Sequence, residues 1–292
     1  MANDKISTSR ISGDEQQVVL ITGASSGIGR SCATYLAEKG YKVYGTTRNR
    51  QGFEDSNSKL PFNSIFMDVN DIESVNSAIE KILASEQRLD AVINNAGFGI
   101  GGPVEFTSIE EAQAQFDTNL FGIMRVCSAV LPAMRSQGAG YIINISSLGG
   151  LIGLPFQGLY SATKFAVEGL SEALYGELRS QGIRVVLIEP GDFATAFTKN
   201  RKQIAKPLTD TNYATDFQRT LSVIESDEMN GANPIKIAQL IDKILRTPNP
   251  RLRYRVGSFS QKLSVVLKKI IPDRLFAWII MDHYQVGKSD HK

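Results

Sequence analysis

The chain has 292 residues, of which 42% are hydrophobic and 21% are charged, and its formal net charge is +2. This composition indicates a soluble globular protein with ample apolar material for a core, and it excludes a disordered or collagen-like chain. The near balance of acidic and basic residues offers no nucleic-acid-binding surface, so we expect no nucleic-acid partner.

The N-terminal residues 1–16 are polar and carry both signs of charge without an apolar stretch. We interpret them as a mobile tail rather than a signal peptide or a membrane anchor. Cys32 and Cys127 are the only cysteines, and both fall in apolar helical patterns, which favours buried free thiols over a disulfide. Free thiols suit a reducing compartment, and we therefore predict a cytoplasmic protein.

Short β-branched apolar runs alternate along the chain with longer segments of helical period. We predict strands at residues 18–21, 43–46, 64–67, 91–93, 141–145 and 185–188, and a further edge strand at 253–256. The predicted helices are residues 28–39, 72–84, 109–134 with an interruption, and 159–180. This alternation is typical of repeated βαβ units, so the predicted fold class is α/β. We expect a doubly wound parallel sheet (Rossmann fold) between two layers of helices, a three-layer α/β/α arrangement.

The domain organisation that we expect is a single Rossmann-type domain over residues 17–257, with a partly helical lid near 196–233. Residues 258–292 form a C-terminal helical extension, which the pattern divides into two amphipathic pieces separated by Pro272. The apolar face with lysines around it suits an interfacial membrane helix. Packing on the domain, a substrate entrance or a partner protein explains the pattern equally well. Charges interrupt it well short of the ~18 apolar residues of a transmembrane span.

A glycine-rich segment follows the first predicted strand and opens the first predicted helix. Glycines there allow a tight turn and let backbone N–H groups approach a pyrophosphate, which indicates a dinucleotide-binding loop. An ordinary glycine turn is the alternative, but the strand-to-helix context favours the dinucleotide. The candidate residues are Gly23, Ser25, Ser26, Gly27, Ile28 and Gly29.

The residues after the second predicted strand bear on the choice of cofactor. An NAD-binding protein places a carboxylate about 20 residues beyond the glycine loop, on the ribose diol. Here Thr47 occupies that position and Arg48 follows it. The Arg48 guanidinium can pair with a 2′-phosphate, so NADP(H) is favoured over NAD(H). The alternative is that Arg48 and Arg50 are solvated loop charges.

Candidate residues for the adenosine side of the site follow the third and fourth predicted strands. Asp68 and Val69 end the third strand, and Asn95, Ala96 and Gly97 follow the fourth. Asp68 can accept a hydrogen bond from the adenine amino group, although a helix N-cap is an equally good role. The small residues Ala96 and Gly97 allow the backbone to pass close to the cofactor.

This ordered set of motifs resembles the short-chain dehydrogenase/reductase family over roughly residues 18–245. The markers are the glycine loop, Asp68, the segment from Asn94 to Gly97, Asn119, Ser147, Tyr160, Lys164, and Pro190-Gly191 followed by Thr195. The C-terminal extension is similar to that of bacterial oxidoreductases allied with hydroxysteroid and retinol dehydrogenases and acyl-dihydroxyacetone-phosphate reductases. The resemblance also implies a homodimer or homotetramer.

The resemblance implies that Asn119, Ser147, Tyr160 and Lys164 are the catalytic residues. Tyr160 and Lys164 are four residues apart, so on a helix they share one face. A tyrosine has a pKa of about 10, and a nearby ammonium favours the phenolate, so the pair suits proton transfer to or from a carbonyl oxygen. By resemblance, Ser147 holds the substrate oxygen, while Asn119 kinks its helix and supports a water-mediated proton relay. The alternatives are a surface Tyr/Lys pair and a core asparagine.

The segment after the sixth predicted strand resembles the one that cradles the nicotinamide in this family. Its candidate residues are Pro190, Gly191, Phe193 and Thr195. Pro190 and Gly191 also suit a plain turn.

The residues near these motifs and the lid predict an apolar substrate pocket. They are Phe98, Ile100, Leu148, Leu151, Leu154, Phe156 and Phe193. The alternative is that these side chains simply pack in the core.

The predicted function is NADP(H)-dependent interconversion of a carbonyl and an alcohol on a hydrophobic steroid, retinoid or lipid-like substrate. Two alternatives stay open: a dinucleotide-sensing protein without chemistry, and an NAD-dependent epimerase or dehydratase. His283 and His291 are the only histidines and no cluster of ligands is apparent, so we expect no metal.

Overall fold

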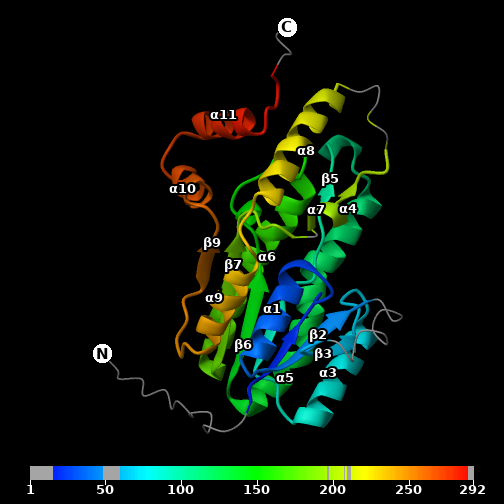
Figure 1. Cartoon of the computed structure of the whole chain (residues 1–292), viewed down its shortest axis with the longest axis vertical. Coiled ribbons are helices and arrows are strands. Elements are labelled where there is room, and N and C mark those ends of the chain that lie inside the picture. Colours follow the sequence, from blue (N-terminus) through cyan, green and yellow to red (C-terminus); the bar gives the residue numbers. More distant parts are fainter. Residues whose placement is uncertain (1–15, 49–59, 196, 207, 209–211, 289–292) are drawn as a thin grey trace.

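A seven-stranded parallel sheet forms the centre of the molecule (Figure 1). The computed structural model describes residues 16–48, 60–195, 197–206, 208 and 212–288, so most of the predicted tail and Arg50 lie outside the described residues. The strands are β1 (Val18–Ile21), β2 (Lys42–Thr47), β3 (Asn63–Phe66), β4 (Ala91–Asn94), β6 (Gly140–Ile145), β7 (Ile183–Pro190) and β9 (Arg253–Val256). Their spatial order is β3-β2-β1-β4-β6-β7-β9. The order reverses at β1, which pairs with β2 and β4, and a crevice opens between such strands at their carboxyl ends.

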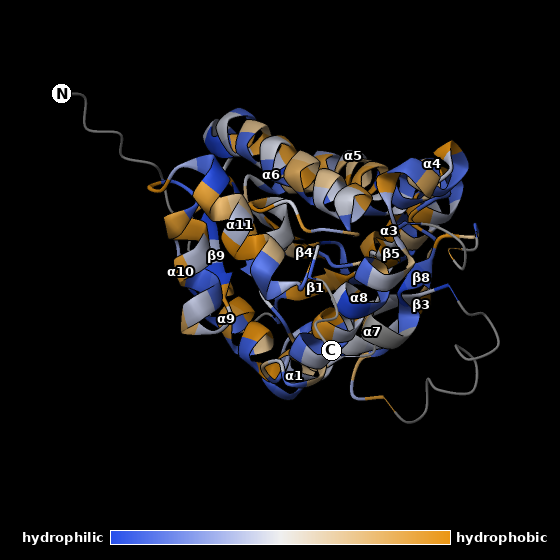
Figure 2. Cartoon of the chain, turned by 90° about the horizontal axis from the view of Figure 1, so that it is seen from above, coloured by the Kyte–Doolittle hydropathy of each residue, from blue (hydrophilic) through white to orange (hydrophobic). Residues whose placement is uncertain are grey.

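Helices cover both faces of this sheet, and Figure 2 shows the resulting three layers. One face carries α3 (Ile72–Glu86), α5 (Gly122–Gln137) and α6 (Gly158–Leu178), and the other carries α1 (Gly27–Glu38) and α9 (Ile235–Leu245). The predicted α/β fold class and layer order are therefore confirmed. Alternate residues of each strand point to opposite faces, so Leu20 packs with the first set of helices and Ile21 with the second.

The remaining elements lie mostly beyond the carboxyl ends of the strands (Figure 1). They are the 3₁₀ turns Val104–Phe106, Leu148–Gly150 and Arg179–Gln181, α4 (Ile109–Phe116), a π-helical turn over Asp117–Phe121, β5 (Ile100–Gly101), α7 (Phe197–Asn200), β8 (Lys202–Gln203), α8 (Ala214–Met229), α10 (Phe259–Leu267) and α11 (Asp273–His283). The π-helical turn is the interruption that the sequence predicts between residues 109 and 134. The two-stranded β5–β8 sheet is not predicted, because two-residue strands carry no periodicity.

The two C-terminal helices fold back over the turn that follows β6. Val265 of α10 and Phe276 of α11 form a small buried cluster with Leu148 and Ile152. Pro272 separates the two helices, as predicted. Among the described residues, no helix combines the length and the apolar character that crossing a membrane requires.

Cys32 and Cys127 are buried free thiols, one on each side of the sheet. Burial raises the pKa of both thiols to about 12, so they remain protonated and unreactive at neutral pH.

Candidate functional site

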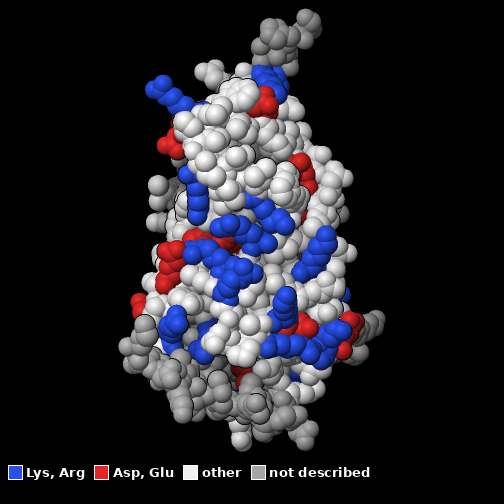
Figure 3. All heavy atoms as spheres, turned by 90° about the vertical axis from the view of Figure 1, so that its left-hand side faces the viewer, with Lys and Arg blue, Asp and Glu red and all other residues white. Residues whose placement is uncertain are grey.

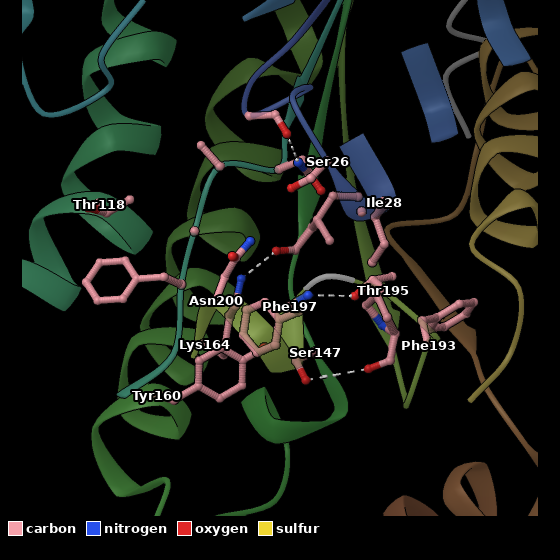
Figure 4. Close-up of a pocket in the computed structure, with 18 of the residues that line it drawn as sticks. Ser26, Ile28, Thr118, Ser147, Tyr160, Lys164, Phe193, Thr195, Phe197 and Asn200 are labelled. Carbon is pink, nitrogen blue, oxygen red and sulfur yellow. Dashed lines mark hydrogen bonds between the residues drawn. The ribbon is translucent and has the colours of Figure 1, made fainter. Parts of the chain in front are cut away.

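A cavity of about 610 Å³ lies at the carboxyl ends of the central strands (Figure 4). Its wall is built from the segments that follow β1, β2, β4, β6 and β7, together with α6 and α8. The predicted cofactor residues on this wall are Gly23, Ser25, Ser26, Gly27, Ile28, Arg48, Val69, Asn95, Ala96, Gly97, Tyr160, Lys164, Pro190, Gly191, Phe193 and Thr195. The fold therefore brings together residues that are up to 172 positions apart, from Gly23 to Thr195.

The glycine loop presents the N-terminus of α1 to the cavity. Gly23 and Gly27 have φ angles of 67° and 57°, which glycine adopts without strain. Ser26 is the N-cap of α1, and its side chain makes no capping hydrogen bond. The Ser26 side chain therefore does not occupy the backbone N–H groups of the first turn, a position at which helices favour anions such as a pyrophosphate.

Asn95 holds this loop against the end of β4. Its side-chain amide donates to the carbonyl oxygens of Thr22 (2.9 Å) and Gly23 (3.1 Å), and the Thr22 hydroxyl accepts from the Asn95 and Ala96 N–H groups. A Cβ on Gly29 would lie 2.4 Å from the Asn95 amide nitrogen. Gly29 therefore belongs to the packing of the loop rather than to the cavity wall.

Arg48 follows β2 and lies exposed on the cavity wall, beyond Thr46 and Thr47. The Thr46 hydroxyl accepts from the Gly23 N–H at 3.1 Å, which joins the end of β2 to the glycine loop. The side chains that end β2 thus offer hydroxyls and a guanidinium, with no carboxylate among Thr46, Thr47 and Arg48.

Asp71, not Asp68, is the N-cap of α3, and Asp68 is not part of the cavity wall. Its carboxylate accepts from the Asn70 N–H at 3.0 Å, and its own N–H donates to the Ser74 hydroxyl. Asp68 organises the turn before α3, while the adjacent Val69 lines the cavity.

Tyr160, on α6, and Ser147, which follows β6, face the same space (Figure 4). Burial raises the pKa of Tyr160 to about 12, and a hydrogen bond with the Ser147 side chain opposes this rise. The Ser147 hydroxyl also accepts from the Gly149 N–H at 3.0 Å, which fixes its orientation. The Phe197 ring lies against Tyr160, with 5.7 Å between the ring centroids.

Lys164 lies one helical turn beyond Tyr160 and is almost completely buried. Its ammonium donates to the Ile145 carbonyl at 2.8 Å and lies 5.8 Å from the centroid of the Tyr160 ring. Burial lowers the pKa of Lys164 to about 8, and the charge of Glu168 opposes this fall.

Asn119 lies in the π-helical turn, is buried, and is not part of the cavity wall. Its side chain accepts from the Phe98 N–H (3.0 Å) and donates to the Phe98 carbonyl (2.9 Å) and the Thr163 hydroxyl (3.1 Å). Asn119 therefore ties the loop after β4 to α6, next to the helical turn that carries Tyr160 and Lys164.

A chain of charges behind Lys164 is not predicted from the sequence. Arg253 of the edge strand β9 pairs with Glu168 (3.1 Å) and Glu172 (2.5 Å) of α6 and lies 3.3 Å from Glu189 of β7. Arg255 pairs with Glu189 at 2.8 Å. The signal that could have revealed it is Glu189, directly after the predicted strand at residues 185–188, since a charge at the end of a buried strand requires a partner.

A second buried network fixes α6 to the sheet. Asn94 donates to Asn144 and Asn144 donates to Ser171 of α6, both at 2.8 Å. Asparagines inside two neighbouring apolar strands are the sequence signal for this contact, which the sequence analysis does not use.

The turn after β7 is held from the C-terminal extension. Gln261 of α10 donates to the carboxylate of Asp192, which lines the cavity between the predicted residues Gly191 and Phe193. The Thr195 hydroxyl accepts from the Phe197 N–H at 3.1 Å. The extension is therefore in direct contact with the site.

The substrate end of the cavity is less apolar than the sequence predicts. Phe98, Leu154 and Phe193 line it, together with Phe197 and Ile224. The other four residues expected there pack elsewhere. Leu148 and Leu151 belong to the cluster with the C-terminal helices. Phe156 contacts Tyr213 and Phe217, and Ile100 is buried in β5.

Three carboxylates line the same end of the cavity: Asp192, Asp227 and Glu228. Burial and the two neighbouring acids raise the pKa of Asp192 to about 6. Glu228 pairs with the buried Arg201, and Asp227 pairs with His283 at 3.0 Å. The charges of Glu228 and Asp192 help to raise the pKa of Tyr160, so they act at the predicted reaction centre.

In the part of the chain that the structure describes, no group of three or more His, Cys, Asp or Glu side chains is arranged to hold a metal ion.

Comparisons with known proteins identify similar chains. The family model described as short chain dehydrogenase matches residues 17–205. The 3-ketodihydrosphingosine reductase of Bacteroides thetaiotaomicron is 43% identical over 272 residues, which cover 93% of this chain and 99% of that protein.

Two solved structures are also similar. A short-chain dehydrogenase from Streptomyces avermitilis superposes with a TM-score of 0.75 and 31% identity, covering 92% of this chain and 97% of that one. An alcohol dehydrogenase from the archaeon Thermococcus sibiricus, complexed with 5-hydroxy-NADP, gives a TM-score of 0.66 and 25% identity, with coverages of 84% and 97%.

Replacement of Glu168 by Gln tests the electrostatic support of Lys164. Because the Glu168 carboxylate raises the pKa of Lys164 against the effect of burial, its loss is expected to move that pKa below about 8, so the ammonium deprotonates at lower pH. NMR titration of the protein with ¹⁵N-labelled lysine measures this, and Lys164→Met identifies the resonance.

Glu172→Gln is the matched control, since Glu172 contacts the same Arg253 but is more exposed and does not act on Lys164. An unchanged Lys164 pKa in Glu168→Gln would contradict the assignment.

Proposed function

The chain belongs to the short-chain dehydrogenase/reductase family, and on that premise we propose that it reduces a hydrophobic ketone with NADPH. One observation carries the proposal: Ser147, Tyr160 and Lys164 face the same cavity that begins at the glycine loop. A nicotinamide dinucleotide bound along this wall would supply the hydride.

The residues on the wall fit such a cofactor. The uncapped N-terminus of α1 suits the pyrophosphate, and the small residues Ala96 and Gly97 leave room beside it. The Lys164 ammonium lines the same cavity and would donate to ribose hydroxyls. Arg48, in the position where a carboxylate would select NAD(H), favours a 2′-phosphate and hence NADP(H).

The proton chemistry follows from the environment of Tyr160. With its pKa raised to about 12, Tyr160 is protonated at neutral pH and can act as the acid that protonates a carbonyl oxygen. Its hydrogen-bonded neighbour Ser147 holds the same oxygen, and Lys164 stabilises the phenolate that forms. Asn119 positions the helical turn that carries both groups, and its place in a π-helical turn suits the proposed water relay towards Lys164.

The substrate that we propose is an amphiphilic ketone with an amino group beside the carbonyl. The Bacteroides relative is named for 3-ketodihydrosphingosine, an aliphatic amino ketone whose amine is cationic at neutral pH. Asp192 and Glu228 act electrostatically on Tyr160, and Asp227 lines the same cavity, so a cationic amine of the substrate would meet carboxylates there. The aromatic residues Phe98 and Phe197 suit the adjoining hydrocarbon.

For the assembly and location we propose a cytoplasmic homodimer or homotetramer. Phe121 and Met124 are both exposed at the start of α5, three residues apart on one helical face, and they suit a subunit contact. The buried free thiols Cys32 and Cys127 suit a reducing compartment.

The two alternative functions, a dinucleotide sensor and an epimerase or dehydratase, make different demands on the site. A dinucleotide sensor without chemistry would have no need of Ser147, Tyr160 and Lys164 in contact with one cavity. An epimerase or dehydratase would retain its reducing equivalents and would not consume free NADPH.

Replacement of Tyr160 by Phe removes the proposed acid while keeping the ring that packs on Phe197. The rate of NADPH-dependent ketone reduction is expected to fall by about 10²–10⁴-fold, whereas cofactor binding measured by calorimetry remains. Tyr175→Phe, on the same helix but bonded to Arg179 away from the cavity, is the control and should keep full activity. Equal turnover by Tyr160→Phe would revive the sensor hypothesis, and failure of the wild type to oxidise free NADPH would favour an epimerase.

Replacement of Arg48 by Ala is expected to lower the ratio of kcat/KM for NADPH over NADH by about tenfold or more, because a charge-assisted hydrogen bond to the 2′-phosphate is lost. Steady-state kinetics with both cofactors measure the ratio. Lys39→Ala removes an exposed cation at the end of α1, outside the cavity wall, and should leave the ratio of kcat/KM for NADPH over NADH unchanged. If Arg48→Ala kept the wild-type ratio, Arg48 would have no part in cofactor choice.

The carboxylates are tested by the double replacement Asp192→Asn/Asp227→Asn, which keeps side-chain shape and removes charge. Selectivity for 3-ketodihydrosphingosine over the same ketone without its amino group is expected to drop about tenfold, the value of a partly solvated ion pair. The measured quantity is the ratio of the two kcat/KM values. Asp282→Asn, exposed on α11, serves as the control. Unchanged selectivity in the double variant would contradict the proposed amine site without contradicting ketone reduction.

A further inference from the structure

The C-terminal helices present two apolar faces, and only one of them is used by the fold. Val265 and Phe276 are buried against the turn after β6. The opposite face carries large apolar side chains that are between 40% and 78% exposed. This second face, called the α10–α11 patch, consists of Phe259, Leu263, Val266, Ile270, Leu275, Trp278 and Met281.

Exposed large apolar side chains are concentrated in the α10–α11 patch. It holds seven of the fourteen large apolar side chains that are exposed among the described residues. Phe259, Leu263, Val266 and Ile270 follow each other at spacings of three or four residues, which places them along one side of α10 and the turn after it. Scattered exposed apolar residues need no explanation, but such a grouping marks an interaction surface.

The charges around the patch indicate its partner. Residues 259–283 contain four cations, Lys262, Lys268, Lys269 and Arg274, against two acids, Asp273 and Asp282. Figure 3 shows this side of the molecule, with a largely uncharged area in its upper part and, below it, a band of Lys and Arg side chains with some Asp and Glu among them. An apolar face with a cationic border matches a bilayer that contains anionic lipids.

Trp278 adds an independent indication. It is the only tryptophan of the chain, and its side chain is 60% exposed on the patch. Tryptophan is enriched at the boundary between lipid headgroups and hydrocarbon, because its ring is apolar and its N–H remains polar.

The patch is also continuous with the cavity wall. α11 leads directly into Tyr284, which lines the cavity, and Leu154 both lines the cavity and packs against the buried cluster that contains Val265 and Phe276. A surface that bound lipid at α10 and α11 would therefore bring the substrate end of the cavity close to the bilayer.

We propose that the α10–α11 patch docks the protein peripherally on the surface of an anionic lipid bilayer. Lys262, Lys269 and Arg274 contact the headgroups, while Phe259, Ile270 and Trp278 enter the boundary with the hydrocarbon. This docking goes beyond the proposed reaction, and it does not depend on turnover.

The test uses the full chain and unilamellar vesicles of phosphatidylcholine containing about one third phosphatidylglycerol. Flotation and the emission of Trp278 report binding. The wild type is expected to float with the vesicles at low salt, with a blue-shifted Trp278 emission, and to bind more weakly at high salt or to pure phosphatidylcholine. Failure of the wild type to bind the anionic vesicles would overturn the proposal.

The double variant Phe259→Glu/Ile270→Glu is expected to bind at least about tenfold more weakly, because it removes two apolar contacts and adds two negative charges. Both side chains are more than 70% exposed, so the fold should be unaffected. The matched control is Ile72→Glu/Ile109→Glu, which makes the same change in charge at two exposed helix N-termini elsewhere and should bind like the wild type.

Two other outcomes would assign the α10–α11 patch a different role. Equal binding by the patch variant and the control would show that the patch is not the lipid contact. If sedimentation showed that the patch variant dissociates an oligomer while vesicles leave the Trp278 emission unchanged, the patch would be a contact between two copies of the chain. Tyr160→Phe should bind vesicles like the wild type, so loss of the proposed reaction and loss of docking are separable.

Discussion

The burial of one cation, the Lys164 ammonium, at the carboxyl end of the sheet constrains much of the surrounding structure. Removing an ammonium from water is costly unless polar groups replace the solvent. The Ile145 carbonyl and the Glu168 carboxylate provide that replacement. Glu168 is itself largely buried, so it needs Arg253, and Arg253 belongs to the edge strand β9. The edge strand β9 thus supplies the cation that pairs with Glu168, although β9 is far from Lys164 in the sequence.

The same chain of contacts reaches the C-terminal extension. β9 leads into α10 through Ser258, whose capping box includes Gln261. Gln261 then donates to Asp192 on the cavity wall. The extension therefore contacts the site in two ways. Gln261 makes a hydrogen bond to the cavity wall, and Val265 and Phe276 pack in a cluster with the turn after β6. Residues added after the last strand are in this way part of the cavity rather than an appendage to it.

Local patterns in the sequence predict much of this architecture. Buried parallel strands are short β-branched runs, and the glycine loop or the Tyr160–Lys164 spacing is visible within a few residues, so each could be identified without a structure. The contacts that the sequence does not reveal join residues far apart in the chain. Asn144 meets Ser171, Arg253 meets Glu168, and Gln261 meets Asp192 only because the strand order brings them together. The place of Asp68 in the turn before α3, where it bonds Asn70 while Asp71 caps the helix, likewise depends on where its side chain points, which periodicity does not encode.

The proposed substrate and the proposed lipid contact of the extension are chemically related. Inside, carboxylates near Tyr160 adjoin the aromatic rings of Phe98 and Phe197. A steroid ketone without a cationic group would leave these carboxylates without a partner, and a small polar ketone would leave the apolar space empty. A long-chain amphiphile satisfies both. Such a molecule resides in bilayers rather than in water, so the proposed docking on a lipid surface would give the enzyme access to the proposed substrate. The α10–α11 patch, with its cationic border and its link to the cavity through Tyr284, has the composition and the position that this access demands.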